Sequence, residues 1–290
     1  MHPSTYVKLA NLATYSYHFR HFMMAGCYCA KRLLRTNVIL VMGMSRSGTT
    51  FLGRLLALDA SRSLYIHEPV KNILRVKYEA SQVEGNTEGF WPYVFSDRMR
   101  PFKLHALVCT VAYLLWRDRH SRKSLVIKPI SMIDTYEKAA SILGSRVVYI
   151  CRHPCGRTES FVRQAEHEEN RTIDSLSEFE RLGDDWGRTH KKALTIHRAH
   201  PGWKWVVFEE LCQSPVKIAR ELYDDLNLKW SHDVATKIEE MTTTESDDLY
   251  GTIRDAGKQI AKWQSALSSD QVEAIRRGTQ VHNTNLYEGF

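Results

Sequence analysis

The stretch Val38 to Thr50, VILVMGMSRSGTT, decides how this sequence folds. Its first five residues form an unbroken apolar run, which predicts a short strand buried on both faces. Gly43 and Gly48 bound a turn, and residues 51–58 predict a helix directly after it. Such a turn forms a cradle for phosphate, because the free backbone N–H groups and the helix dipole both point at the anion. The stretch therefore predicts that a phosphorylated ligand binds here.

The loop differs from that of nucleotide triphosphatases, which require G-x-x-x-x-G-K-[ST]. The glycine spacing is kept, but Thr49 occupies the lysine position and the cation is Arg46, inside the loop. This arrangement suits a shorter anion than a triphosphate. The loop resembles the phosphosulfate loop of the sulfotransferases, which bind 3′-phosphoadenosine 5′-phosphosulfate (PAPS). Its R-S-G-T-T form resembles the carbohydrate and tyrosyl-protein branches, in which Arg replaces the Lys of the cytosolic branch.

A second motif supports this resemblance. The apolar run 146–150, RVVYI, predicts a buried strand, and Arg152 follows it, with Ser160 eight residues later on a predicted helix. This stretch resembles the 3′-phosphate motif of the same family, R-x-P followed by a helix that carries Ser. Two motifs in the family's order, each after a buried strand, are more specific than either one alone.

The resemblance implies a set of cofactor-binding residues. The loop at 252–267, TIRDAGKQIAKWQSAL, resembles the loop that closes over the cofactor, with Lys262 and Trp263 matching the family's K-W. A solvated basic loop is the alternative for this segment. The residues expected to bind the cofactor are Ser45, Arg46, Ser47, Gly48, Thr49, Thr50, Arg152, Ser160, Arg254, Gly257, Lys258 and Lys262.

Four residues are candidates for catalysis. Arg46 is expected to stabilise the bridging oxygen and the leaving phosphate, because a guanidinium offers several donors and stays charged. Lys128 ends a predicted strand and matches the Lys that binds the transferring group in the tyrosyl-protein branch. Glu68 matches the carboxylate proposed as base in carbohydrate-type enzymes, whereas His67 would suit the base of the cytosolic branch. Neighbouring strand residues face opposite ways, so only one of them is expected to face the site if the strand continues there.

The whole sequence predicts an α/β fold of the P-loop type, with three layers and a central, mainly parallel sheet flanked by helices. The second strand should lie beside the first, since sequential elements usually neighbour each other. A single domain over 1–290 is expected. One departure from the tyrosyl-protein pattern is Phe208, which replaces a Tyr that contacts the nucleotide. The expected strands are 38–42, 63–69, 124–130, 146–150 and 204–210, and the expected helices include 1–37, 133–143 and 173–199.

Residues 70–122 are expected to be an insertion that builds the substrate pocket. Residues 71–103 have weak periodicity and read as a long irregular lid, whereas 104–116 predict a buried helix or a pocket wall. Trp91, Tyr93 and Phe95 could line an acceptor pocket or serve only as packing residues.

Composition sets further bounds. A net charge of +7 favours anionic ligands, but the basic residues are dispersed and no nucleic-acid motif is present, so no nucleic-acid partner is expected. The six cysteines lack zinc spacing, and no carboxylate cluster suggests a metal, so buried reduced thiols and a cytoplasmic location are expected. The N-terminal segment gives no sign of a membrane span. The first 37 residues hold no apolar stretch long enough for the N-terminal membrane anchor that Golgi sulfotransferases carry. Their basic and aromatic residues predict a packing helix, with peripheral membrane contact as the alternative.

The function predicted is transfer of a sulfuryl group from PAPS to a hydroxyl or amine of a small-molecule, sugar or lipid acceptor. Transfer in line with a general base needs positioned cations and no metal. One alternative is a P-loop nucleotide kinase, which would need Lys at position 49 and an Asp that holds Mg²⁺. Another is a nucleotide-binding module without chemistry. The sequence leaves the acceptor and the oligomeric state open.

Overall fold

The computed structural model describes residues 36–83, 85, 89, 93–94, 96, 99–117, 123–129, 135–169, 171–243 and 256–290. The chain divides into two compact units. The first contains the chain up to Met42 and Asp59–Val147, and the second contains Gly43–Leu58 and Val148–Phe290. The expectation of one domain over 1–290 stays a prediction.

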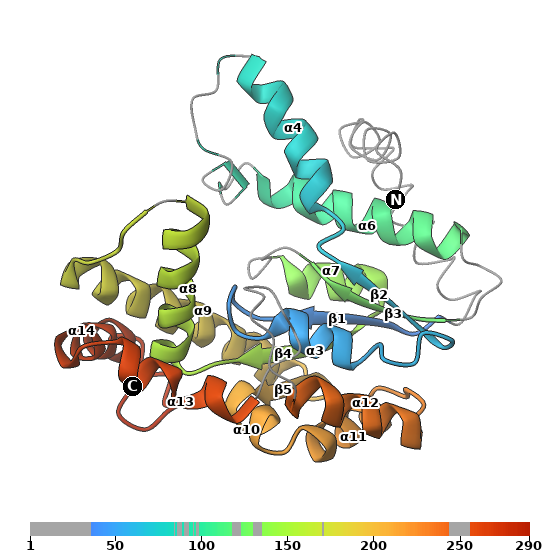
Figure 1. Ribbon diagram of the computed structural model, residues 1–290. Coiled ribbons are helices and arrows are strands. Elements are labelled where there is room, and N and C mark those ends of the chain that lie inside the picture. The colour runs from blue at the N-terminus through green and yellow to red at the C-terminus, as the bar shows by residue number, and fades with distance from the viewer. Residues whose placement is uncertain are drawn as a thin grey trace. The chain divides into compact units, whose positions relative to one another are not determined.

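The described strands form one five-stranded sheet in the order β2-β3-β1-β4-β5. The pairs β1 with β3, β2 with β3 and β4 with β5 are parallel. Helices accompany these strands in both units, so the predicted α/β class with a parallel sheet is confirmed (Figure 1). The strands are β1 (Val38–Met42), β2 (Ser63–His67), β3 (Ser124–Lys128), β4 (Arg146–Cys151) and β5 (Lys204–Val207).

In the first unit β3 lies between β1 and β2, so the expectation that the second strand lies beside the first is wrong. The reason is the apolar content of the strands. Leu125, Val126 and Ile127 in the middle of β3 are all buried, whereas β2 buries only Ser63 and Ile66. A continuous apolar run suits an interior strand, which is covered on both faces and paired on both edges, so β3 lies inside the sheet. The more polar β2 lies at the edge.

The helices that the structure describes in the first unit include α4 (Lys71–Val83), α6 (Met99–Arg117) and α7 (Tyr136–Leu143). The expectation of an irregular segment over 71–103 is wrong for α4, which contains no glycine or proline and buries Ile73 and Leu74, and for 99–103, which begin α6. Burial around much of α6 confirms the buried helix expected at 104–116. Tyr93 is buried with its ring centroid 5.5 Å from that of Tyr78, which favours a packing role for it, while Trp91 and Phe95 lie outside the described residues.

Most of the helices in the described residues lie in the second unit. Ser175 caps α9 by accepting a hydrogen bond from the Glu178 backbone N–H, and Pro215 occupies the first position of α11, where its missing N–H costs no intrahelical hydrogen bond. The helices are α3 (Thr49–Leu55), α8 (Pro154–Glu169), α9 (Leu176–Ala199), α10 (Phe208–Gln213), α11 (Pro215–Asp225), α12 (His232–Thr243), α13 (Ala256–Ala266) and α14 (Ser269–Gln280).

Two expectations for this unit are wrong. Residues 208–210 continue as helix α10 instead of extending β5, because Glu209 and Glu210 stand in the first helical turn, where the helix dipole favours negative charge. The predicted loop at 252–267 forms helix α13 from Ala256, while Arg254 lies outside the described residues.

The four described cysteines, Cys109, Cys151, Cys155 and Cys212, are buried and form no disulfide, as expected of reduced thiols. The expected helix over 1–37 lies almost wholly outside the described residues. Within the part of the chain that the structure describes, no helix is both long and apolar enough to cross a bilayer.

Candidate active site

The glycine-bounded loop after β1 has the tight geometry that its sequence predicts. Gly43 has φ +155°, and a Cβ atom there would lie 2.5 Å from the carbonyl oxygen of Ile150. Gly48 has φ +86°, and its Cβ would lie 2.5 Å from Cδ2 of Phe208. Real Cβ contacts are not this short, and positive φ disfavours other residues. Both glycines are therefore required, and they let the loop backbone lie directly against β4 and α10.

Arg46 joins this loop to the second predicted phosphate motif. Its Nε donates a hydrogen bond of 2.9 Å to Oγ of Ser160, which lies on α8. In return, Nη1 of Arg152 donates a hydrogen bond of 3.2 Å to the carbonyl oxygen of Arg46. Arg46 and Arg152 are more than a hundred positions apart in the sequence. The structure thus brings together the three residues on which the two motifs depend.

Arg152 is a buried cation with a defined set of contacts. Its side chain lies over the ring of Phe208, 4.5 Å from the centroid, and its Nη2 donates to the carbonyl oxygen of Gln259 on α13 at 3.1 Å. Burial lowers the pKa of Arg152, and the carboxylate of Glu209 opposes this shift. A guanidinium stays protonated even so, and a charge removed from water interacts strongly with an anion.

The other residues expected to bind the cofactor differ in their exposure and in the element that carries them. In the loop, Ser47 and Thr49 are buried, Ser45 is exposed, and Thr50 is half-buried at the start of α3. Oγ of Ser47 is buried and has no hydrogen-bond partner among the described residues, a state that proteins usually avoid unless a ligand or water completes the bonding. Gly257, Lys258 and Lys262 all lie on α13, the helix whose Gln259 contacts Arg152.

The remaining catalytic candidates lie in the first unit. His67 ends β2 opposite Lys128, which ends β3, and the next residue, Glu68, forms an ion pair with Lys128. Nζ of Lys71 lies 3.6 Å from Oε2 of Glu68, and Nε2 of His67 lies 4.0 Å from the same oxygen. On its other side, Nδ1 of His67 lies 3.1 Å from the Tyr65 hydroxyl. The half-buried carboxylate of Glu68 thus lies close to the side-chain nitrogens of Lys128, Lys71 and His67.

The argument that only one of His67 and Glu68 can face a site does not apply, because β2 ends at His67. Glu68 turns with φ 40°, outside the extended region, and the two side chains approach each other.

The charges around Glu68 determine its protonation. Burial raises the pKa of this carboxyl, but Lys128 lowers it by charge and by hydrogen bonding, and His67 and Lys71 lower it further. The net effect is a pKa below the ordinary value. Glu68 is therefore ionised near neutral pH and able to accept a proton.

Arg46 and Glu68 both have a positive φ, which few residues other than glycine adopt. Among the residues that the structure describes, those with positive φ other than glycine are Arg46, Glu68, Asn227, Asn283 and Asn285. Asn tolerates this region because its short side chain bonds locally, whereas Arg and Glu have no such compensation. Strained residues of this kind cluster at functional sites, so the conformation supports both candidates.

Sequence reasoning missed three residues that complete this region: Glu209, Gln259 and Tyr287. Glu209 was assigned to a strand, and Gln259 acts through its backbone carbonyl, which no side-chain pattern reveals. Tyr287 lies 78 positions from Glu209, the residue it contacts. Among the described residues, no group of three or more His, Cys, Asp or Glu side chains could hold a metal ion.

Comparison with known proteins gives the chain its family. Residues 38–232 match the model of the sulfotransferase family. The matched range includes both predicted phosphate motifs and the Glu68–Lys128 pair. No curated protein matches the sequence significantly.

Solved structures share the fold at low sequence identity. Mouse sulfotransferase SULT7A1, solved with 3′-phosphoadenosine 5′-phosphate (PAP), has a TM-score of 0.55 at 13% identity, and the match covers 87% of this chain and 86% of that one. The sulfotransferase domain of the curacin biosynthetic pathway has a TM-score of 0.52 at 15% identity over 82% and 96%. Retinol dehydratase in complex with androsterone and PAP has a TM-score of 0.51 at 14% identity over 87% and 83%.

The family match spans most of the chain and agrees with the resemblance predicted from its two phosphate motifs, so this protein belongs to the sulfotransferase family.

Proposed function

We propose that this protein transfers a sulfuryl group from PAPS to a hydroxyl or amine of an acceptor, and that the second unit binds the nucleotide. The observation that carries the proposal is the contact of Arg46 with Ser160, together with that of Arg152 with the Arg46 carbonyl. It joins a 5′-phosphate loop to a 3′-phosphate motif through two arginines. A nucleotide with phosphate on both positions fits such a pair, whereas ATP offers no 3′-phosphate.

The residues present fit this ligand. The glycine-bounded loop leaves room only for backbone, and the Ser47 hydroxyl is buried without a partner in the described chain. The residues that would hold the 5′-phosphate are Ser45, Arg46, Ser47, Gly48, Thr49 and Thr50. Those that would hold the 3′-phosphate are Arg152 and Ser160, together with Gly257, Lys258 and Lys262 of α13, the helix whose Gln259 carbonyl accepts a hydrogen bond from Arg152. The cofactor role of Arg254 rests on its position in the sequence alone.

Each catalytic candidate has a distinct task. PAPS supplies the reactive phosphosulfate anhydride when it is bound. Arg46 holds positive charge where negative charge develops on the leaving phosphate, and its hydrogen bond to Ser160 orients the guanidinium. Glu68 accepts the proton of the acceptor hydroxyl or amine, and Lys128 keeps this carboxylate ionised. His67 is half exposed beside Glu68 and is the alternative base.

The acceptor proposed is a small molecule with a hydroxyl group. Retinol dehydratase, which shares the fold, is solved with androsterone. The sugar and amine acceptors expected from the sequence remain part of the proposal as further substrates to screen.

Calorimetric titration tests the nucleotide site. Wild-type protein should bind PAP and ignore ATP with Mg²⁺, and Arg152→Ala should weaken PAP binding about 100-fold, because a buried charge pair is lost. Arg181→Ala, an exposed arginine on α9, is the matched control and should bind PAP as the wild type does. Binding of Mg²⁺–ATP without PAP would instead favour a kinase.

A further inference from the structure

We infer that Tyr287, in the C-terminal segment at residues 281–290, is a positioning residue for Arg152 and so sets affinity for the 3′-phosphate of the nucleotide. The inference rests on the proposed function and adds to it a residue outside both phosphate motifs and outside the 38–232 range of the family match.

Tyr287 is linked by hydrogen bonds to both chain neighbours of Arg152. Its hydroxyl donates to Oε2 of Glu209 at 2.7 Å, and Oε1 of the same carboxylate accepts the backbone N–H of His153 at 3.0 Å. The Tyr287 oxygen also lies 3.5 Å from Sγ of Cys151. The carbonyl of Arg152 itself accepts a hydrogen bond of 2.9 Å from Nε1 of Trp186. The main chain on either side of the guanidinium is therefore fixed by side chains from three other elements.

Aromatic contacts extend this support to α13. The His153 ring is stacked on Trp263 with centroids 4.7 Å apart and an interplanar angle of 7°. Tyr287 and Phe290 meet the same ring edge-on, at centroid distances of 5.0 and 4.8 Å. Trp263 belongs to α13, the helix whose Gln259 carbonyl accepts from Arg152. The C-terminal segment thus holds both the turn that carries Arg152 and the helix that covers it.

The charge state of this network suits the role. Burial raises the pKa of Tyr287, so its hydroxyl stays protonated and remains a donor. Burial also lowers the pKa of His153 to about 4, and its neutral ring accepts a hydrogen bond from the Cys155 backbone N–H at Nδ1. The carboxylate of Glu209 stabilises the buried Arg152 cation. A Glu209 that lost Tyr287 would keep only its hydrogen bond to the His153 backbone N–H.

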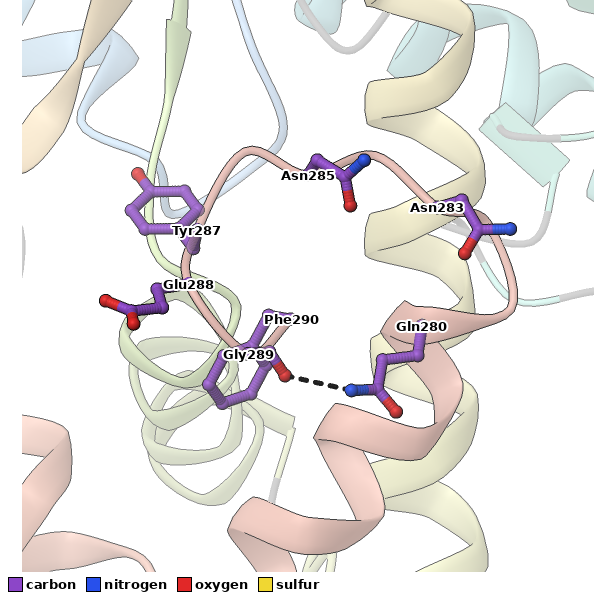
Figure 2. A pocket seen from close by; sticks show the side chains of 7 residues that line it. All are labelled: Gln280, Asn283, Asn285, Tyr287, Glu288, Gly289 and Phe290. Carbon is purple, nitrogen blue, oxygen red and sulfur yellow. Dashed lines mark hydrogen bonds between the residues drawn. The ribbon is translucent and has the colours of Figure 1, made fainter.

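The backbone of the C-terminal segment at residues 281–290 turns back after α14 and positions the Tyr287 side chain. It leaves α14 through Asn283 and Asn285, both with positive φ, and its Gly289 carbonyl accepts a hydrogen bond of 3.1 Å from Nε2 of Gln280. Figure 2 shows this bond and shows the Tyr287 ring extending away from Gln280, on the other side of the segment. The pocket of about 450 Å³ at this place is lined by the segment and by Gln280.

The test compares two nucleotides that differ in the 3′-phosphate. PAP and AMP are titrated into wild-type protein and Tyr287→Phe, which keeps the ring and removes the hydroxyl. If Tyr287 positions Arg152, the Kd for PAP rises about tenfold, and the Kd for AMP changes less than about twofold, because only PAP uses the guanidinium. In an Arg152→Ala background, Tyr287→Phe should add almost no further loss, since the two residues act on one interaction.

Two further variants separate positioning from general stability. Tyr223→Phe removes another buried tyrosine hydroxyl, which donates to the Leu55 carbonyl at 2.9 Å, and should leave the Kd for PAP unchanged. Glu209→Gln removes the charge and one of the two acceptor oxygens at the other end of this contact, and it should repeat the selective loss of PAP.

Equal losses for PAP and AMP, or unchanged PAP binding in Tyr287→Phe, would overturn the inference while wild-type PAP binding stands. A wild-type protein that does not bind PAP would overturn the proposed function and the inference with it.

Discussion

Gly48→Ala should destabilise the protein strongly, for two reasons that the structure separates. An Ala at φ +86° adopts the left-handed region, which costs about 1–2 kcal/mol. Its Cβ would also lie 2.5 Å from Cδ2 and 2.8 Å from Cε2 of the buried Phe208 ring, and overpacking of this kind costs about 1–3 kcal/mol. The expected loss in the free energy of unfolding is therefore about 2–5 kcal/mol.

Gly85→Ala is the matched control for the backbone contribution. Gly85 has a similar φ of +91°, but a Cβ there would meet no atom within 4 Å. Its loss should be only about 1–2 kcal/mol. Phe208→Val removes the two ring atoms that clash, so Gly48→Ala made in that background should also fall to about 1–2 kcal/mol. Urea unfolding followed by fluorescence measures all four variants. Equal losses for Gly48→Ala and Gly85→Ala would refute the assignment of Phe208 as the residue that requires glycine in the loop.

Two further predictions concern proton transfer and acid stability. Glu68→Gln should lower kcat at least about 100-fold, because the base is removed, and should leave the Kd for PAP within about twofold; an equal effect on binding would place Glu68 in the nucleotide site instead. His153 and His190 are buried with pKa values of about 4, against 6.5 when exposed, so the folded state binds fewer protons than the unfolded state between these values. Stability is therefore full above pH 6.5 and falls as the pH drops toward 4, with a loss of about 2 kcal/mol per histidine at pH 5. Urea unfolding at pH 8 and pH 5 measures this loss, and His190→Phe should reduce it by about half; an unchanged pH dependence in that variant would contradict the assignment.

The two motifs of the proposed nucleotide site, which the structure brings together, could be predicted because their information is local. The loop at 43–50 and the stretch from Arg152 to Ser160 each follow a buried apolar strand, and a short motif after such a strand has few alternative conformations. The strands themselves were predictable for the same reason. Their order was not, because the place of β3 between β1 and β2 depends on which apolar faces find cover in the folded chain.

The supporting residues could not be predicted from local patterns. The support of Arg152 by Glu209, Gln259 and Tyr287 uses a carboxylate, a backbone carbonyl and a phenol from three separate elements, and each type of group is common on protein surfaces. The orientation of Glu68 toward His67 and Lys128 depends on a single backbone angle at the end of β2, and periodicity carries no information on such an angle.

The positive φ angles of Arg46 and Glu68 have a consequence for anyone who engineers this protein. Glycine adopts this conformation without penalty, so Arg46→Gly or Glu68→Gly would relieve about 1–2 kcal/mol of backbone strain while deleting a group proposed to act in catalysis. Selection for heat resistance alone does not protect these two positions from inactivating change, because relief of backbone strain offsets part of the stability lost with the ion pair of Glu68 and the hydrogen bond of Arg46. A library that fixes both residues and varies the rest of the chain avoids that outcome.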